Sequence, residues 1–250
     1  MENSVEIIQV AAFLGAGIAV SVSSIAAGIG EGYVAGEAVK AITKQPESRD
    51  SVVRSMFIGQ AVDETGGIFS LVIALLLLFG GFAVPGGGWQ KAAALLASGI
   101  AVGLGAVGPV FGAGYAGGQA CKSIGRMPKH SNDILGNMLI GQALAQTSSI
   151  FALVVSLLLL YTVPNQAADA TVGMMILKSV SLLGAGLSIG LGTLGPGSGI
   201  GIVAGKASEM MGKFPKERKE IMRTMFLGAA VSESTAIYSL VVSFLLLFIS

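Results

Sequence analysis

Charged residues are scarce in this sequence: Asp, Glu, Lys and Arg make up 12% of the 250 residues, while 53% are hydrophobic. Soluble globular domains carry roughly 25% charged residues, so this composition excludes a cytosolic enzyme and a disordered chain. The formal net charge is only +1, which leaves no global field that would attract nucleic acid. We therefore expect no nucleic-acid partner.

Cysteine and histidine are almost absent, with Cys121 and His130 the single example of each. One cysteine excludes a disulfide framework, a thiolate zinc site and an iron–sulfur cluster. One histidine excludes metal sites built from several imidazoles. No cofactor is expected, and both residues are expected to be ordinary loop residues.

Glycine, by contrast, is abundant, with 37 residues, about twice the usual share of roughly 7%. No Gly-X-Y period is present, which excludes collagen. A chain that is both apolar and rich in glycine is typical of closely packed membrane helices, because small residues let backbones approach one another. The pattern leaves open whether the helices pack tightly inside a six-helix bundle or form the crowded inner layer of a closed ring.

Three segments repeat one pattern without gaps: residues 56–65, 138–147 and 225–234. Each leads into a Leu-rich segment and follows a Gly-rich apolar segment, and these apolar segments exceed the ~20 residues needed to cross a bilayer. Helix is the expected state, because open sheet edges cannot face lipid. We predict an all-α membrane protein with six transmembrane helices, arranged as three tandem helical hairpins over residues 1–85, 86–165 and 166–250.

Basic residues are concentrated in the loop inside each predicted hairpin. These loops hold 13 of the 15 Lys and Arg residues: Lys40, Lys44, Arg49, Arg54, Lys122, Arg126, Lys129, Lys206, Lys213, Lys216, Arg218, Lys219 and Arg223. By the positive-inside rule, the three loops are expected in the cytoplasm and both termini outside.

Four acidic residues fall inside the predicted spans: Glu31, Asp63, Glu64 and Glu233. A charge at the centre of a bilayer costs at least ~2.5–3.5 kcal/mol, so such residues favour a functional interpretation. Glu64 and Glu233 occupy the same position in the repeat, and a hydroxyl residue, Thr65 or Ser234, follows each. Carboxylate, hydroxyl and carbonyl oxygens together can hold a proton or a small cation. Asp63 has no acidic counterpart, and the pattern leaves it either as a protonated packing residue or as a third acid at the site.

These segments resemble a known family. Residues 59–72 and 230–241 look like the ion-binding outer helix of the ATP synthase c subunit, the rotor-ring proteolipid, and residues 28–36 resemble its inner helix. Lys44, Gln45 and Pro46 resemble the polar loop that touches the central stalk in that family. The resemblance covers nearly the whole chain, although family members ordinarily have one hairpin and V-type relatives often two.

The resemblance implies a closed homo-oligomeric ring in membrane lipid, which we expect in a prokaryotic plasma membrane. Each carboxylate would take up H⁺ or Na⁺ at the stator, hold it in neutral form around the ring, and release it beside a stator arginine. Rotation would be coupled to ATP synthesis or hydrolysis through the central stalk, so the chain would not itself be an enzyme. The alternative is a stand-alone channel or cation transporter, which would conduct ions without a stator.

The three hairpins are not equivalent. The carboxylate position holds Gln146 in the second hairpin, and the inner-helix position that holds Glu31 in the first hairpin holds Ala113 there. A neutral glutamine cannot be charged and discharged, so we expect the second hairpin to translocate nothing.

In the family, the adjacent hairpin completes each ion site with a carbonyl, a hydroxyl and a tyrosine. The corresponding residues are Val62 and Thr65 in the first hairpin, and Val231, Ser234 and Tyr238 in the third. If the third hairpin of one chain abuts the first hairpin of the next, Glu31 and Glu64 would share a site with Val231, Ser234 and Tyr238. One of the two carboxyls would stay protonated, because like charges oppose each other. Na⁺ at Glu31, Glu64, Ser234 and Tyr238 is slightly favoured over H⁺, and the choice stays open.

Overall fold

The computed structural model describes residues 2–83, 88–163 and 171–249, with no side chains for residues 2–4. Every regular element among these residues is helical, and six helical rods are long and apolar enough to cross a membrane. The all-α prediction with six membrane helices is therefore confirmed. The predicted hairpin boundaries at residues 85/86 and 165/166 lie outside the described residues.

The rods pair into three hairpins. The first pairs α1 (Glu2–Lys44) with α2 (Arg49–Asp63) and α3 (Thr65–Phe79), the second pairs α4 (Gly88–Arg126) with α5 (Ser131–Tyr161), and the third pairs α6 (Val172–Gly192) and α7 (Leu194–Lys213) with α8 (Arg218–Phe248). A 3-10 turn that begins with proline links the two arms of each hairpin: η1 (Pro46–Ser48), η2 (Pro128–His130) and η3 (Pro215–Glu217). Proline favours this place, because it fixes φ at the start of a helix where no amide hydrogen is needed.

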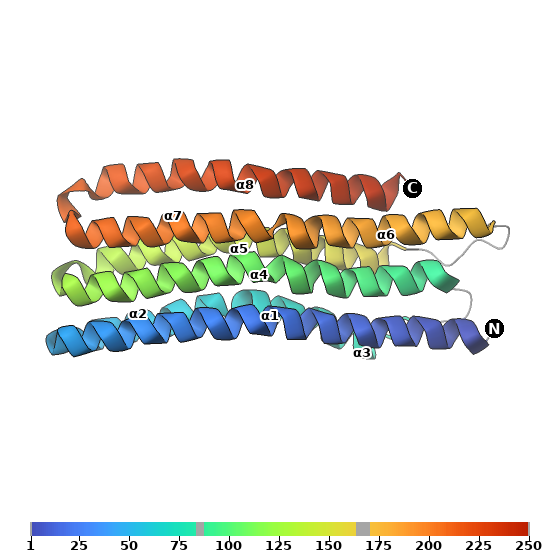
Figure 1. Ribbon diagram of the computed structural model, residues 1–250, viewed down its shortest axis with the longest axis horizontal. Helices are drawn as coiled ribbons and strands as arrows, with labels where there is room; N and C mark the ends of the chain where they lie inside the picture. Colours follow the sequence, from blue (N-terminus) through green and yellow to red (C-terminus); the bar gives the residue numbers. More distant parts are fainter. Residues whose placement is uncertain (1, 84–87, 164–170, 250) are drawn as a thin grey trace.

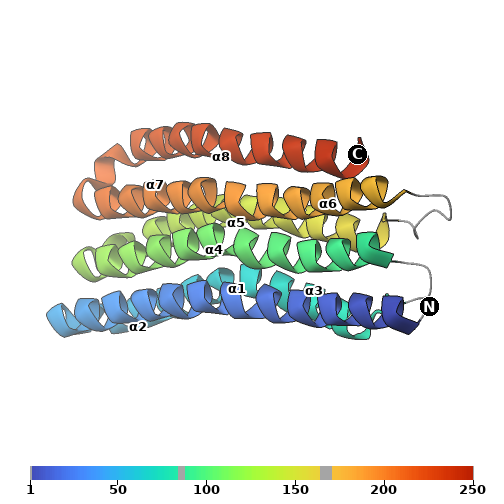
Figure 2. The same ribbon diagram turned by 45° about the vertical axis from the view of Figure 1, so that its right-hand side comes forward.

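The helices form two layers. The Gly-rich helices α1, α4 and α6/α7 lie side by side, with α4 in the middle, and the second arms of the hairpins, α2/α3, α5 and α8, lie against them (Figures 1 and 2). Among the described residues, α1 makes no extensive contact with α6, α7 or α8. The bundle is therefore not closed, and the row of Gly-rich helices ends in two open flanks.

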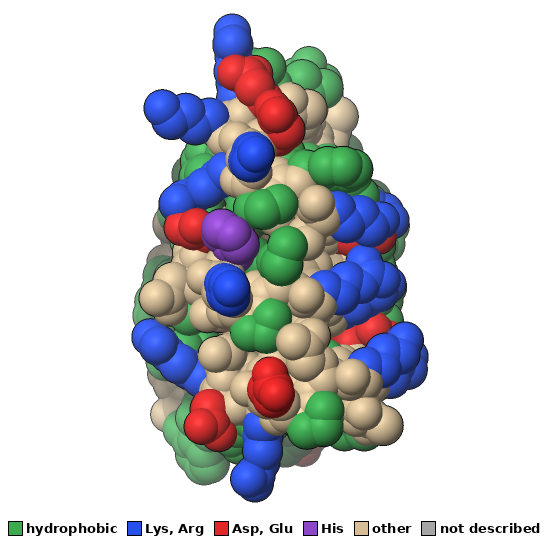
Figure 3. All heavy atoms as spheres, turned by 90° about the vertical axis from the view of Figure 1, so that its left-hand side faces the viewer, with side chains coloured by type: hydrophobic (Ala, Val, Ile, Leu, Met, Phe, Trp, Pro, Cys, Tyr) green, Lys and Arg blue, Asp and Glu red, His purple; other side chains and the backbone are tan. Residues whose placement is uncertain are grey.

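All three hairpin loops lie at one end of the molecule, and both chain termini lie at the other (Figure 1). Viewed from the loop end, Lys and Arg side chains surround a face that also carries acidic groups (Figure 3). The basic residues of the three loops thus gather at one end, as expected for hairpins of equal orientation.

Glycine sets the spacing between the Gly-rich helices α1, α4 and α6/α7, which we call the inner row. A Cβ atom added to Gly112 of α4 would collide with the backbone of Gly197 and lie 3.3 Å from the Cα atom of Gly201, both in α7. Backbones this close leave no room for a side chain, which is the packing reason for glycine in the helix interior.

Pro109 lies within α4 without ending the helix. Proline has no amide hydrogen, so the carbonyl of Gly105, four residues earlier, loses its helical partner. The Thr193 hydroxyl, at the break between α6 and α7, lies 3.2 Å from this carbonyl oxygen and 2.9 Å from the Ile189 carbonyl oxygen, so it can donate its one hydrogen to either.

The expectation that Cys121 is a loop residue is wrong, because its side chain is fully buried within α4 against Val52 and Ile134. His130 does lie in the loop, at the end of η2. The polar residues around Cys121 in the sequence gave no sign that its own face of the helix points inward.

We predict that Gly112→Ala destabilises the protein by about 1–3 kcal/mol, the usual cost of overpacking. Gly136→Ala is the matched control, because nothing lies within 4 Å of a Cβ atom at Gly136 in α5. Thermal unfolding of the detergent-solubilised protein measures both variants. Equal midpoints for the two variants would show that the inner row is not as tightly packed as described.

Candidate functional site

The acid positions lie halfway along the second rod of each hairpin. Glu64 lies between α2 and α3 and is exposed, whereas Glu233 lies within α8 and is half-buried. Gln146 occupies the equivalent place in α5 and is buried. The three positions differ in exposure, because the residues that contact Gln146 and Glu233 include residues of the preceding hairpin.

Glu233 is bound by two hydroxyl groups of the preceding hairpin. Thr147 Oγ1 lies 2.7 Å from Glu233 Oε1, and Ser148 Oγ lies 3.1 Å from Glu233 Oε2. Both hydroxyls come from α5, so the site lies between the second and third hairpins. An apolar groove of about 400 Å³ opens beside it, lined by Phe151 and Ile200 among others. Ile200 stands at the inner-helix position and supplies no oxygen.

The Thr147 hydroxyl has two possible acceptors but only one hydrogen. Its oxygen lies 2.6 Å from the Leu144 carbonyl oxygen as well as 2.7 Å from Glu233 Oε1. If the hydrogen goes to Leu144, the second contact is a full hydrogen bond only when Glu233 is protonated and donates to Thr147. The arrangement therefore fits a carboxylate that accepts from Thr147 as well as a protonated carboxyl that donates to it.

Gln146 also contacts the preceding hairpin, but through a main-chain carbonyl rather than a hydroxyl pair. Its Nε2 atom donates to the Val62 carbonyl at 3.3 Å, and its Oε1 atom accepts from Ser149 at 3.0 Å. One helical turn away, Gln142 Nε2 donates to the carbonyls of Gly59 and Ala113 at 2.9 Å each. At this position the second hairpin thus contacts the first hairpin through an amide and not through an ionisable group.

Glu64 has no such neighbour within the chain. Among the described residues, no hydroxyl or amide is bonded to its carboxylate, and it lies on an open flank of the molecule. Val231 and Tyr238, which were predicted to complete its site, are 74% and 67% exposed on the third hairpin. Ser234 bonds the Val231 carbonyl of its own helix at 2.7 Å. One chain does not bring these four residues together.

Asp63 faces the opposite way from Glu64. Its side chain is fully buried, neither carboxylate oxygen has a hydrogen-bond partner among the described residues, and it lies against the backbone of Gly30. Nearby, the main-chain carbonyl of Glu31 accepts a hydrogen bond from Gln60 Nε2 at 3.1 Å. A charge at Asp63 would be unpaired in the interior, so this position favours the packing interpretation.

Sequence reasoning missed Ser148. Its signal was present, because a pair of adjacent hydroxyl residues recurs at the same place in the third hairpin as Ser234 and Thr235. Thr235 now bonds the Ser232 carbonyl of its own helix at 3.0 Å. Only the contact of the second hydroxyl with Glu233 reveals what such a pair does.

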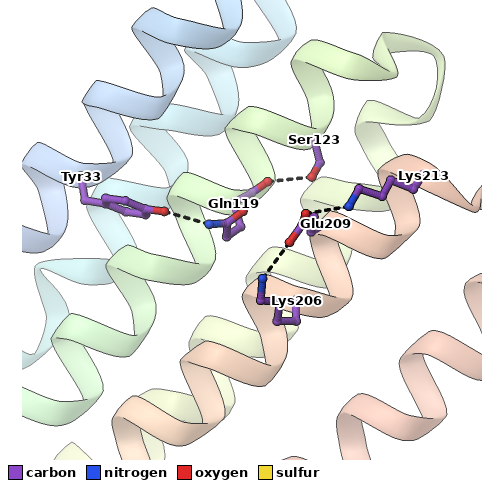
Figure 4. A network of polar contacts seen from close by, with 6 residues as sticks. All are labelled: Tyr33, Gln119, Ser123, Lys206, Glu209 and Lys213. Carbon is purple, nitrogen blue, oxygen red and sulfur yellow. Dashed lines mark hydrogen bonds and ion pairs between the residues drawn. The ribbon is translucent and has the colours of Figure 1, made fainter.

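A second polar cluster lies nearer the loop end (Figure 4). Gln119 of α4 donates to the Tyr33 hydroxyl of α1 at 2.8 Å. In α7, Glu209 pairs with Lys206 at 3.0 Å and with Lys213 at 2.9 Å. The first contact joins α1 to α4 and the two ion pairs lie within α7, so we assign these groups to packing.

Comparison with known proteins gives the same repeat. The family model for the ATP synthase C subunit matches residues 14–77, 96–159 and 183–246. The chain is similar to the ATP synthase c subunit of Alkaliphilus oremlandii, with 49% identity over 74 residues that cover 30% of this chain and 83% of the relative. It is also similar to the K subunit of the A-type ATP synthase of Methanocaldococcus jannaschii, with 28% identity over 234 residues that cover 94% of each chain. A chain of this length is therefore not peculiar to this protein.

Thr147→Val should speed the reaction of Glu233 with a lipid-soluble carbodiimide, because the carboxyl is freed from its closest hydroxyl. We expect about a fivefold effect, the equivalent of one ~1 kcal/mol hydrogen bond. Peptide mapping by mass spectrometry measures the rate at each site. Thr65→Val is the control, since Thr65 holds the equivalent repeat position in the first hairpin. If Glu233 reacts at the same rate in both variants, the Thr147 contact does not slow its reaction.

Proposed function

This chain belongs to the ATP synthase C subunit family and is a non-catalytic rotor component of a rotary ATP synthase; we propose that it carries ions by loading and unloading Glu64 and Glu233. The observation that carries the proposal is the seat of Glu233 on the Thr147 and Ser148 hydroxyls of the preceding hairpin. A carboxylate in a bilayer must be neutralised before it meets lipid. The two hydroxyls would help to hold the ion that neutralises the Glu233 carboxylate.

We infer that the chain closes into a ring with further copies. In the second and third hairpins, three glycines of the inner helix contact the preceding hairpin: Gly99, Gly114 and Gly118, then Gly186, Gly201 and Gly205. Their equivalents in the first hairpin, Gly17, Gly32 and Gly36, have nothing within 4 Å of a Cβ atom. The third hairpin of another copy supplies the missing neighbour.

In this ring, the third hairpin of one copy completes the site of Glu64 in the next. By the repeat, Ser234 and Thr235 take the places that Thr147 and Ser148 hold beside Glu233, while Tyr238 takes the place of Phe151. The predicted set of Glu31, Glu64, Val231, Ser234 and Tyr238 would then come together across two chains. The Val62 carbonyl instead accepts a hydrogen bond from Gln146 within the chain.

The second hairpin carries no ion in this scheme, because Gln146 and Ala113 offer nothing to titrate. Each chain then presents two working carboxylates for three hairpins. Fewer ions pass per turn than in a ring of equal size with an acid in every hairpin. Such a ring suits ATP-driven pumping, or ATP synthesis at high ion-motive force.

The remaining partners follow from the same role. The stator would supply an arginine that separates the loading and release paths, and membrane lipid would surround the rest of the ring. The loop at Lys44, Gln45 and Pro46 would touch the central stalk. This places the three loops in the cytoplasm and both termini outside, in a prokaryotic plasma membrane.

We infer that the carried ion is H⁺. The Glu233 site has Ile200 and Phe151 where further oxygen ligands would be needed for Na⁺, while the Thr147 geometry suits a protonated carboxyl. A ring cannot usefully mix two coupling ions. Na⁺ is the second candidate, because Glu31, Ser234 and Tyr238 would offer additional oxygens to Glu64.

Glu64→Gln and Glu233→Gln should each abolish ATP-driven ion pumping by the complete enzyme complex, down to the background of vesicles without ATP. Each variant removes a group that must alternate between a loaded and an unloaded state. Asp63→Asn is the control and should keep most of the pumping. The dye quench of inverted membrane vesicles measures all three, and pumping retained by Glu233→Gln would refute the proposed role.

Na⁺ discriminates between the two candidate ions. If H⁺ is carried, Na⁺ at neutral pH should leave the carbodiimide labelling rates of Glu64 and Glu233 unchanged. Labelling rates are compared in vesicles with sodium and with potassium salts. Slower labelling in sodium would replace H⁺ by Na⁺ in this account without affecting the rotor role.

A further inference from the structure

At the loop end, one pair of positions faces across each junction between hairpins. The preceding hairpin contributes the third residue of its second helix, and the following hairpin contributes the first residue of its second helix. Between the first and second hairpins these are Ser51 and Ser131, which line the same small cavity. Between the second and third they are Asp133 and Arg218, which form an ion pair. We call these two positions the junction pair.

The repeat places Glu220 and Arg49 at the same two positions. Glu220 is the third residue of α8 and Arg49 is the first residue of α2. Both side chains are exposed, and neither has an ion-pair partner among the described residues. They lie on opposite open flanks, so they cannot meet within one chain.

We propose that Glu220 of one copy forms an ion pair with Arg49 of the next copy, and that this pair favours head-to-tail joining of the chains. The proposal rests on the ring inferred above. It repeats at the chain-to-chain junction the Asp133–Arg218 contact that the chain makes internally.

The surface beneath Glu220 supports a second copy as its occupant. An apolar groove of about 430 Å³ runs between α7 and α8, lined by Val203, Ala207 and Ile221 among others. The equivalent residues of the first hairpin are Val34, Ala38 and Val52. All three are buried under the second hairpin in this chain. The groove therefore has the shape of a hairpin junction without its second half.

The charges also select against the wrong assembly. Two copies that met through their third hairpins would place Glu220 against Glu220, and two that met through their first would place Arg49 against Arg49. Like charges oppose both symmetric dimers, whereas head-to-tail joining pairs opposite charges. An exposed ion pair adds little affinity, so the pair acts mainly on the choice of partner surface.

Cross-linking tests the contact in membranes that contain the full chain. In a Cys121→Ser background, Glu220→Cys/Arg49→Cys is treated with a short bismaleimide and run on a denaturing gel. We expect a ladder of covalent multimers. The matched control, Asp133→Cys/Arg218→Cys, should cross-link within the chain and remain a monomer on the gel.

A control that links while Glu220→Cys/Arg49→Cys stays monomeric would overturn the proposed junction. The native mass of the unmodified protein in mild detergent then separates two failures. An oligomer without the ladder contradicts the junction pair alone. A monomer contradicts the ring and with it the proposed function.

Charge reversal tests the role of the pair in ordering the chains. Glu220→Arg and Arg49→Glu should each weaken association at every junction by roughly 1.5- to 5-fold, the range for an exposed ion pair. The double variant should recover the oligomer yield of the unmodified chain, as measured by size-exclusion chromatography in mild detergent. A double variant no better than either single variant would contradict the pairing.

Discussion

The structure depends on one constraint: a carboxyl group in the middle of an apolar slab must have polar partners, and its own helix cannot provide all of them. Glu233 finds those partners in Thr147 and Ser148 of the preceding hairpin. Gln146 finds its partner in the Val62 carbonyl in the same way. Glu233 and Gln146 thus both take polar partners from the preceding hairpin, and this gives the row of hairpins a direction.

Because all three hairpins point the same way along the row, the free side of the first hairpin is complementary to the free side of the third. In the first hairpin, no hydroxyl of the described residues is hydrogen-bonded to Glu64. In the third hairpin, no acid in the described part of the chain is hydrogen-bonded to the hydroxyl pair Ser234 and Thr235. The glycines of the inner row hold the hairpins at the spacing that brings seat and acid together. The proposed ion site therefore depends on the packing of two hairpins and cannot be understood from one hairpin.

The helical hairpins, the acids near the middle of their second helices and the amide at the same position of the second hairpin could be predicted from the sequence, because each depends on a local pattern that repeats at fixed spacing. The direction of each side chain could not. Asp63 and Glu64 are adjacent in the sequence, yet one is fully buried beside Gly30 and the other is exposed. The burial of Cys121 and the contact of Ser148 likewise depend on which helix lies opposite each residue. The composition of the sequence does not reveal that helix.

The most direct test of this account is a structure of the detergent-extracted oligomer at a resolution that shows side chains. The account predicts that the Glu64 carboxyl of each copy lies within hydrogen-bond distance of the Ser234 and Thr235 hydroxyls of the neighbouring copy. A Glu64 carboxyl that contacts only its own chain, or that faces the centre of the oligomer, would contradict it.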